Sequence, residues 1–186
     1  MAKPASRTPA NESHVLVTAS ASQPRSPLLP LTKRIADCGC NLVEARLAAL
    51  GQEVVVSALA SGSWDAIAKF EATAARLERE EGMRLQVTRT GARAPESASL
   101  PYMIEVVAAD KSGVLYELAE FFSSRGIAVE QLNSTRYKAT QTGAEMFTAQ
   151  ITVGIPAKTH IAALRDDFLE FCDSLNLDAI MDPIKY

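Results

Sequence analysis

The sequence has little histidine and cysteine, the residue types on which many catalytic and metal sites depend. Of its 186 residues, two are histidines and three are cysteines. His14 falls at the expected start of a strand and His160 at the expected start of a helix. Neither accompanies a nucleophile or paired carboxylates at a spacing typical of catalysis. We therefore predict that the chain is not an enzyme.

The cysteines do not form a metal-binding or redox motif. Cys38 and Cys40 are separated by one residue, whereas zinc knuckles and redox pairs usually have two residues between their cysteines. With Cys172 the count is odd, which argues against a disulfide framework. We expect three reduced thiols that pack as small apolar side chains, and we expect neither a metal nor a cofactor.

The sequence also has no long apolar run and no dense run of basic residues. No stretch approaches the roughly eighteen uninterrupted apolar residues of a membrane-spanning helix, and residues 1–12 contain no apolar core of a signal peptide. The net charge of −3 and the pI of about 5.5 give no overall electrostatic attraction to nucleic acid. These absences predict a soluble, cytoplasmic protein that binds neither membranes nor DNA directly.

The sequence does contain one order of predicted elements twice, about ninety residues apart. In the first copy, apolar periodicity predicts strands from His14 and over 41–50, 52–61 and 83–89, and helices from Pro27 and after Ser63. In the second copy it predicts strands over 103–109, 127–137, 144–153 and 177–181, and helices from Val114 and Pro156. Each copy therefore has the order βαββαβ.

A βαββαβ unit forms a four-stranded antiparallel sheet with both helices on one face, the ferredoxin-like sandwich. We therefore assign the chain to the α+β class, with two tandem ferredoxin-like βαββαβ sandwiches. The predicted boundaries are a disordered tail over 1–12, a first domain over 13–90, a linker over 91–101 and a second domain over 102–186. Two such units can bury each other's open surfaces, as an internal pseudo-dimer does.

The strand over 103–109 leads directly into the turn Asp110-Lys111-Ser112-Gly113-Val114 and then into a helix. Gly113 has no Cβ, so the backbone can reverse here and pass close to a ligand. The free N–H groups at the start of the helix face the turn and could hold a small carboxylate. The alternative is that Asp110, Ser112 and Gly113 serve only to cap the helix.

This turn resembles the Asp-x-Pro-Gly-Ile/Val turn of ACT domains, small regulatory modules that sense amino acids. A second resemblance lies in the first copy: Cys38-Gly39-Cys40-Asn41-Leu42, Glu44, Arg46-Leu47-Ala48, Leu50-Gly51 and Ser61-Gly62-Ser63-Trp64 are similar to the first ACT domain of the glycine cleavage system transcriptional repressors. The resemblance covers nearly all of the chain after the tail. It implies a cytoplasmic tandem-ACT protein that represses the glycine cleavage operon by antagonising a DNA-bound transcriptional activator when glycine is scarce.

The resemblance also implies a ligand site, because ACT effectors lie where the first strand-to-helix turn of one domain faces the second strand of another. The implied ligand-binding residues are Asp110, Ser112, Gly113 and Val114 in the second copy and Asn41 in the first, with glycine or a similar small amino acid as the ligand. Ser112 replaces the motif proline, Ala128 stands where Asn41 stands in the first copy, and the first turn reads Gln23-Pro24-Arg25-Ser26. We therefore expect at most one working site, and Asn41 could equally be a polar turn residue.

The sequence is compatible with three functions. The first is a transcriptional regulator that acts through protein contact, the second an amino-acid sensor that controls a metabolic enzyme, and the third an interaction module without an effector. Trp64 is either a partner hot spot, if it is exposed, or a hydrophobic anchor on the sandwich. The oligomeric state is also open, a homo-oligomer included.

Overall fold

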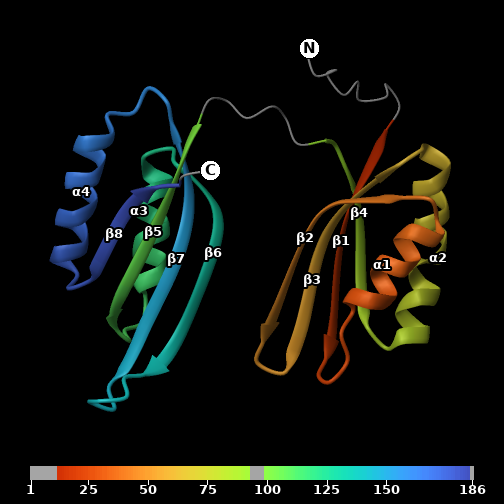
Figure 1. The fold of residues 1–186 in the computed structure, drawn as a ribbon, viewed down its shortest axis with the longest axis horizontal. Helices are drawn as coiled ribbons and strands as arrows, with labels where there is room; N and C mark the ends of the chain where they lie inside the picture. The colour runs from red at the N-terminus through yellow and green to blue at the C-terminus, as the bar shows by residue number, and fades with distance from the viewer. Residues whose placement is uncertain (1–11, 93–98, 185–186) are drawn as a thin grey trace, which may run out of the picture. The chain divides into compact units, whose positions relative to one another are not determined.

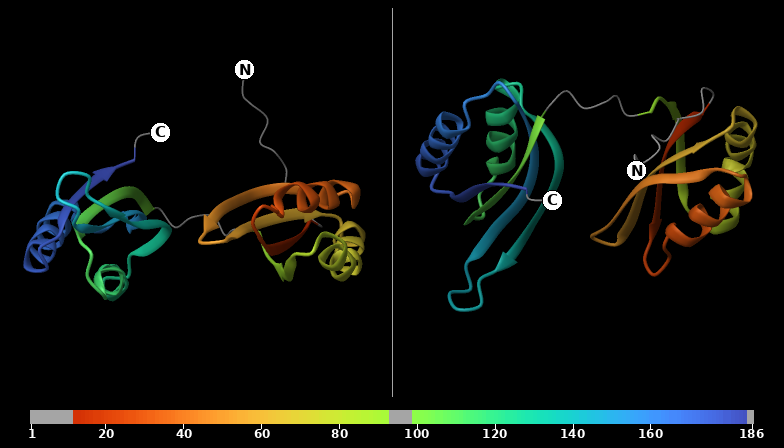
Figure 2. Two further views of the ribbon diagram at one scale, coloured as in Figure 1. Left: turned by 90° about the horizontal axis from the view of Figure 1, so that it is seen from below. Right: turned by 45° about the horizontal axis from the view of Figure 1, so that its top comes forward.

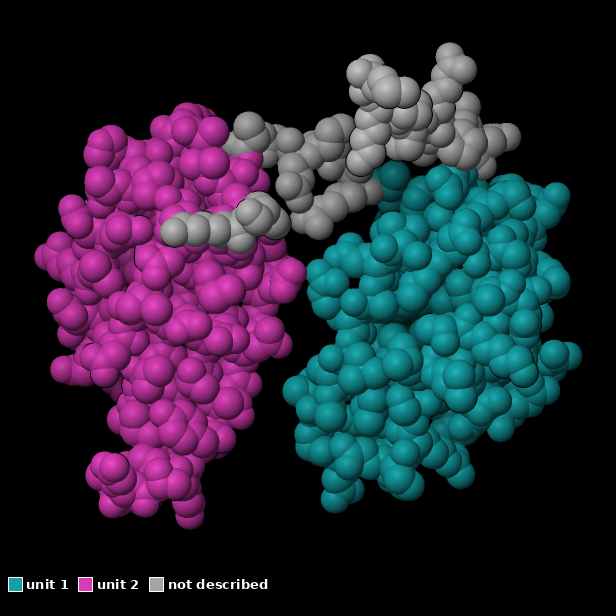
Figure 3. All heavy atoms as spheres, viewed as in Figure 1, with its two compact units in different colours: residues 1–94 teal, residues 95–186 magenta. Residues whose placement is uncertain are grey.

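The computed structural model describes residues 12–92 and 99–184. The chain divides into two compact units, residues 1–94 and 95–186 (Figure 3). Most of the predicted tail and the middle of the predicted linker lie outside the described residues. The last residues assigned to the linker, from Ser99, belong to the first strand of the second unit.

The first unit consists of β1 (Ser13–Ser22), α1 (Leu28–Asp37), β2 (Asn41–Leu50), β3 (Glu53–Gly62), α2 (Trp64–Glu81) and β4 (Arg84–Thr90). Its sheet has the strand order β2-β3-β1-β4, and all neighbouring strands are antiparallel. Both helices lie on one face of this sheet (Figures 1 and 2).

The second unit repeats this arrangement with β5 (Ser99–Ala109), α3 (Val114–Ser124), β6 (Ala128–Lys138), β7 (Glu145–Pro156), α4 (Ile161–Ser174) and β8 (Asp178–Pro183). The strand order β6-β7-β5-β8 corresponds strand by strand to that of the first unit, and the pairing is again antiparallel. The predicted fold, two tandem ferredoxin-like βαββαβ sandwiches, is confirmed.

Each unit has its own apolar core between its sheet and its helices. In β1, Val15, Val17 and Ala19 are fully buried and alternate with more exposed residues, so one face of the strand is turned to the helices. In the second unit, Phe122 of α3 and Phe168 of α4 are fully buried, with ring centroids 5.3 Å apart. Burial of one such side chain contributes about 1.5–3 kcal/mol, which holds the helices on the sheet.

Two helix starts show where the sequence was interpreted correctly and where it was not. Ser63 caps α2 as predicted, because its Oγ accepts a hydrogen bond from the backbone N–H of Ala66 at 3.2 Å. Pro156, however, does not open the last helix but is the final residue of β7, where a strand tolerates a missing N–H. The helix starts at Ile161 instead, and Nδ1 of His160 accepts from the backbone N–H of Ala163 at 3.2 Å.

The strands β2 and β6 are exposed along their whole length. Each forms an edge of its sheet, and most of its length is not covered by a helix (Figure 1). Apolar residues of β2, such as Leu47 and Leu50, therefore stay outside the core although they follow a strand pattern. No helix within residues 12–92 and 99–184 is long and apolar enough to cross a bilayer.

Candidate functional site

The turn between β5 and α3 is held in place by the backbone. The N–H of Asp110 donates to the carbonyl oxygen of Glu145 at 2.9 Å, which ties the turn to the start of β7. Gly113 adopts a φ of 94° and precedes the first residue of α3, a left-handed conformation that favours glycine. Because glycine has no side chain to cap the helix, the first N–H groups of α3 are available to an acceptor from outside the helix.

A pocket of about 430 Å³ lies beside this turn. It is bounded by the turn and the start of α3 on one side and by the far end of β6 on the other. The lining residues are Asp110, Lys111, Gly113, Val114 and Leu115 from the turn and helix, Ser134, Thr135 and Arg136 from β6, and Phe147 from β7. The pocket thus combines two basic groups, one carboxylate, two hydroxyls and a helix N-terminus, a set that matches the charges of a small amino acid.

Arg136 is one of six residues lining this pocket that the sequence did not predict, and it contacts a predicted residue directly. Its Nη2 forms an ion pair with Oδ2 of Asp110. Arg136 pairs in register with Phe147, which is buried, so the arginine lies on the strand phase that points toward the helix side of the sheet. The sequence signal is a charged residue on that phase of a strand, which places Arg136 on the helix side of the sheet without identifying its partner.

The structure brings together three of the five predicted ligand residues. Asp110, Gly113 and Val114 line the pocket. Ser112 lies in the same turn and is exposed, but it does not line the pocket. Asn41 is the first residue of β2 in the first unit, where it is exposed and pairs in register with Ser61.

The corresponding turn of the first unit shares one backbone hydrogen bond with this turn but differs in its side chains and in the residue before the helix, which is Pro27 in a right-handed conformation. The N–H of Gln23 donates to the carbonyl of Gln52 at 2.8 Å, the equivalent of the Asp110 bond. In the first unit, Val54 of β3 pairs in register with Ala21 on one side and with Ala49 on the other. In the second unit, Phe147 of β7 pairs in the same way with Ala108 and Arg136. Gln23 and Ala49 therefore stand where the second unit has Asp110 and Arg136, and this turn carries neither member of the ion pair.

Comparison with known proteins finds a family that the first unit resembles. Residues 13–88 match the family model of the ACT domain. The first unit is therefore similar to an ACT domain. The chain is also 26% identical over 179 residues to the glycine cleavage system transcriptional repressor of Escherichia coli (strain K12), covering 96% of this chain and 94% of the relative. The repressor of Shigella flexneri matches to the same extent.

Solved structures show the tandem arrangement of this fold. A crystal structure provisionally assigned as a glycine cleavage system transcriptional repressor matches with a TM-score of 0.71 and 22% identity, over 94% of this chain and 99% of the other. An unknown protein from Galdieria sulphuraria matches with a TM-score of 0.74 and 13% identity, over 94% and 100%. The second unit repeats the fold of the first, and the similarity to the Escherichia coli repressor supports a regulatory role.

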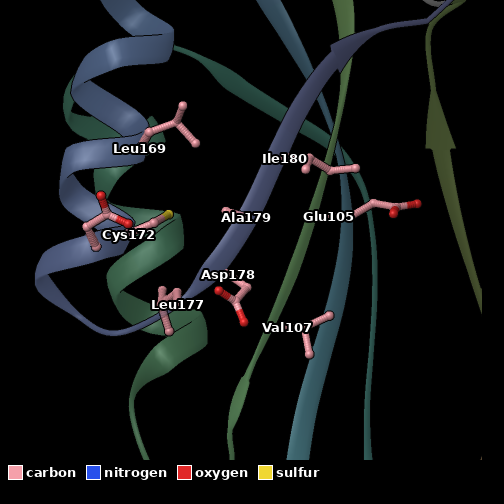
Figure 4. A pocket seen from close by; sticks show the side chains of 9 residues that line it. Glu105, Val107, Leu169, Cys172, Leu177, Asp178, Ala179 and Ile180 are labelled. Carbon is pink, nitrogen blue, oxygen red and sulfur yellow. The ribbon is translucent and has the colours of Figure 1, made fainter.

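Two further hollows lie among residues 12–92 and 99–184. One, of about 550 Å³, lies between the first turn and the end of α2 and includes Arg25, Glu80 and Glu81. The other, of about 350 Å³, lies beside α4 and β8 and includes Glu105, Cys172 and Asp178 (Figure 4). Neither hollow includes a residue predicted for the ligand site.

Cys172 has the wrong chemistry for a nucleophile. Burial, with a smaller effect of the Asp173 charge, raises the pKa of its thiol to about 12, so almost no thiolate forms at neutral pH. Burial also raises the pKa of Cys40, with a smaller contribution from Cys38. Within the described part of the chain, no group of three or more His, Cys, Asp or Glu residues is arranged to hold a metal ion.

Proposed function

We propose that this chain is a cytoplasmic transcriptional regulator that represses the glycine cleavage operon through contact with a DNA-bound activator. The observation that supports this most is the similarity to the Escherichia coli glycine cleavage repressor along 96% of the chain. Every helix of the two units is used in a sandwich core, and the net charge is −3. Both facts fit a protein that acts on a partner and does not read DNA itself.

The proposed signal is glycine or another small amino acid, bound at the turn Asp110–Val114. The ligand carboxylate would face the N-terminus of α3 and Lys111, and the ligand ammonium would face Asp110. Asn41 and Ser112 remain proposed contacts, on the strength of the ACT resemblance alone. A bound amino acid alters the partner surface only to the extent that it favours one conformation of the protein over another.

Calorimetric titration with glycine, alanine and serine tests the ligand site. We expect heat of binding from the unaltered chain and a loss of binding in Gly113→Val, because a β-branched residue is strained at a φ of 94° and would displace the turn. Gly126→Val is the matched control, since Gly126 also has a positive φ, of 65°, in the same unit and does not line the pocket. No heat from the unaltered chain, or equal loss in both variants, would count against the site.

A reporter assay tests the regulatory role. The chain would be expressed in Escherichia coli that lacks its own glycine cleavage repressor, with a reporter fused to the glycine cleavage promoter. We expect repression without added glycine and relief when glycine is supplied, with Gly113→Val unresponsive to glycine. Unchanged reporter activity, or a gel shift of promoter DNA by the purified chain alone, would contradict the proposed mechanism.

A second function, an interaction module without an effector, is favoured by one observation. The first unit has Gln23 and Ala49 in place of the ion pair of the second unit, so duplication alone does not preserve the charged pocket. If the tagged chain recovers a partner whose binding no amino acid alters, this alternative replaces the sensor. A metabolic enzyme as that partner, with amino-acid dependence, would indicate an enzyme-controlling sensor instead.

A further inference from the structure

The ion pair of the second unit joins a sheltered acid to an exposed base. Arg136 Nη2 contacts Asp110 Oδ2, and the side chain of Asp110 is 20% exposed whereas that of Arg136 is 67% exposed. The carboxylate is therefore held in the wall of the pocket, and the guanidinium reaches it from the solvent side. Because an ion pair with one partner largely in water is weak, Arg136 can leave Asp110 and be solvated at little cost.

The backbone need not move when Arg136 leaves. Arg136 lies on β6, an edge strand of its sheet, and its backbone stays paired in register with Phe147 whichever way the side chain points. The ladder between β6 and β7 therefore stays intact with the guanidinium in or out of contact with Asp110.

Asp110 is the one acid among the nine described residues that line the pocket. A ligand carboxylate can approach the N-terminus of α3 or Lys111 without disturbing the ion pair. A ligand ammonium has no other carboxylate in the lining to bind, so it requires the group that Arg136 holds. The two cations thus compete for one anion.

We propose that Arg136 is a built-in competitor that sets the affinity and the selectivity of this site. It takes the position of the ligand ammonium on Asp110, so an amino acid binds only when its ammonium displaces the guanidinium. A carboxylate ligand without an ammonium group does not face this competition. The inference rests on the proposed function, because it assumes that an amino acid binds beside Asp110.

The test is calorimetric titration of the full chain and of Arg136→Met with glycine, alanine and serine, and with N-acetylglycine, which has the carboxylate but no ammonium. Methionine keeps an apolar stem and removes the charge. Lys138→Met is the matched control, because Lys138 lies on the same strand, pairs with Glu145 at 3.4 Å and does not line the pocket. Thermal melts verify that each variant keeps its fold. Arg136→Gln, which also removes the charge, is the second variant and is titrated in the same way.

We expect Arg136→Met to bind the amino acids about twofold to fivefold more tightly, the range for loss of a weak competing ion pair. Its binding of N-acetylglycine should not tighten, and Lys138→Met should match the unaltered chain.

Unchanged or weaker amino-acid binding by Arg136→Met overturns the inference while the proposed function stands, because the unaltered chain still binds. Tighter binding of N-acetylglycine as well would also overturn it, since competition for Asp110 cannot act on that ligand. If neither the unaltered chain nor either Arg136 variant binds an amino acid, the proposed function itself fails, and the competition fails with it.

Discussion

Phe122 and Trp64 are both large aromatic residues near a helix end, but their surroundings differ. Phe122 is fully buried in the core of the second unit. Trp64 is 62% exposed, and the guanidinium of Arg89 lies 5.7 Å from the centroid of its ring. Arg89 in turn donates two hydrogen bonds to Glu71, at 2.8 and 2.7 Å. Of the two interpretations of Trp64, the exposed side chain fits a contact residue for a partner, whereas a hydrophobic anchor on the sandwich would be covered.

Stability measurements should separate these two aromatic residues. We expect Phe122→Ala to lower the free energy of unfolding by about 3–5 kcal/mol, since it leaves a cavity in a filled core. Trp64→Ala should cost less than about 1 kcal/mol, because little area is uncovered. Urea denaturation of both variants gives the comparison, and a larger loss in Trp64→Ala would contradict the packing described.

The cysteines provide a second test at the residue scale. Burial raises the pKa of Cys172 to about 12 and also raises that of Cys40, and all three cysteines are buried. The thiolate is the reactive species, so we expect alkylation of the native protein at pH 8 to be slow and to accelerate as the pH rises toward 12. In denaturant all three thiols should react quickly, and rapid native labelling of Cys172, followed by mass spectrometry, would contradict this account.

At the scale of elements, local signals predicted which segments form helices and strands but not every boundary. The Ser63 cap could be predicted, because serine before an apolar helical pattern has a direct electrostatic role at the free N–H groups. The start of α4 could not be predicted, because proline is common at helix starts and histidine is an unusual N-cap residue. Only the fold shows that Pro156 completes β7 and that His160 supplies the acceptor.

The His160 cap predicts a specific loss of stability. His160→Ala removes the acceptor for the N–H of Ala163, and we expect the second unit to lose about 0.5–2 kcal/mol. His160→Asp should restore or exceed the original stability, because aspartate is a favoured cap and its charge suits a helix N-terminus. Thermal unfolding followed by circular dichroism would contradict the capping role if both variants were equally destabilised.

At the scale of the whole molecule, the repeated order βαββαβ could be predicted, because the spacing of apolar residues within each segment indicates a helix or a strand. The difference between the two turns was partly visible too, since the first lacks the acid and the glycine of the second. The partner of Asp110 was not predicted, because the ion pair depends on the register of β6 against β7, which brings position 136 beside position 110. The site depends on how distant strands pair, and the spacing of apolar residues along one strand does not determine that pairing.

The same comparison predicts that one of two similar turns binds the ligand. Both turns share a backbone hydrogen bond to the following hairpin, so this bond does not distinguish them. The side chains do, since the second has Asp110 and Arg136 where the first has Gln23 and Ala49.

The most direct measurement is a titration of the ¹⁵N-labelled chain with glycine, followed by amide chemical shifts. We predict saturable shifts at residues 110–114 and at Arg136, with the amides of Gln23, Arg25 and Ser26 unchanged. Shifts confined to residues 23–26, or none at 110–114 at any glycine concentration, would contradict the claim that the second turn is the receptor.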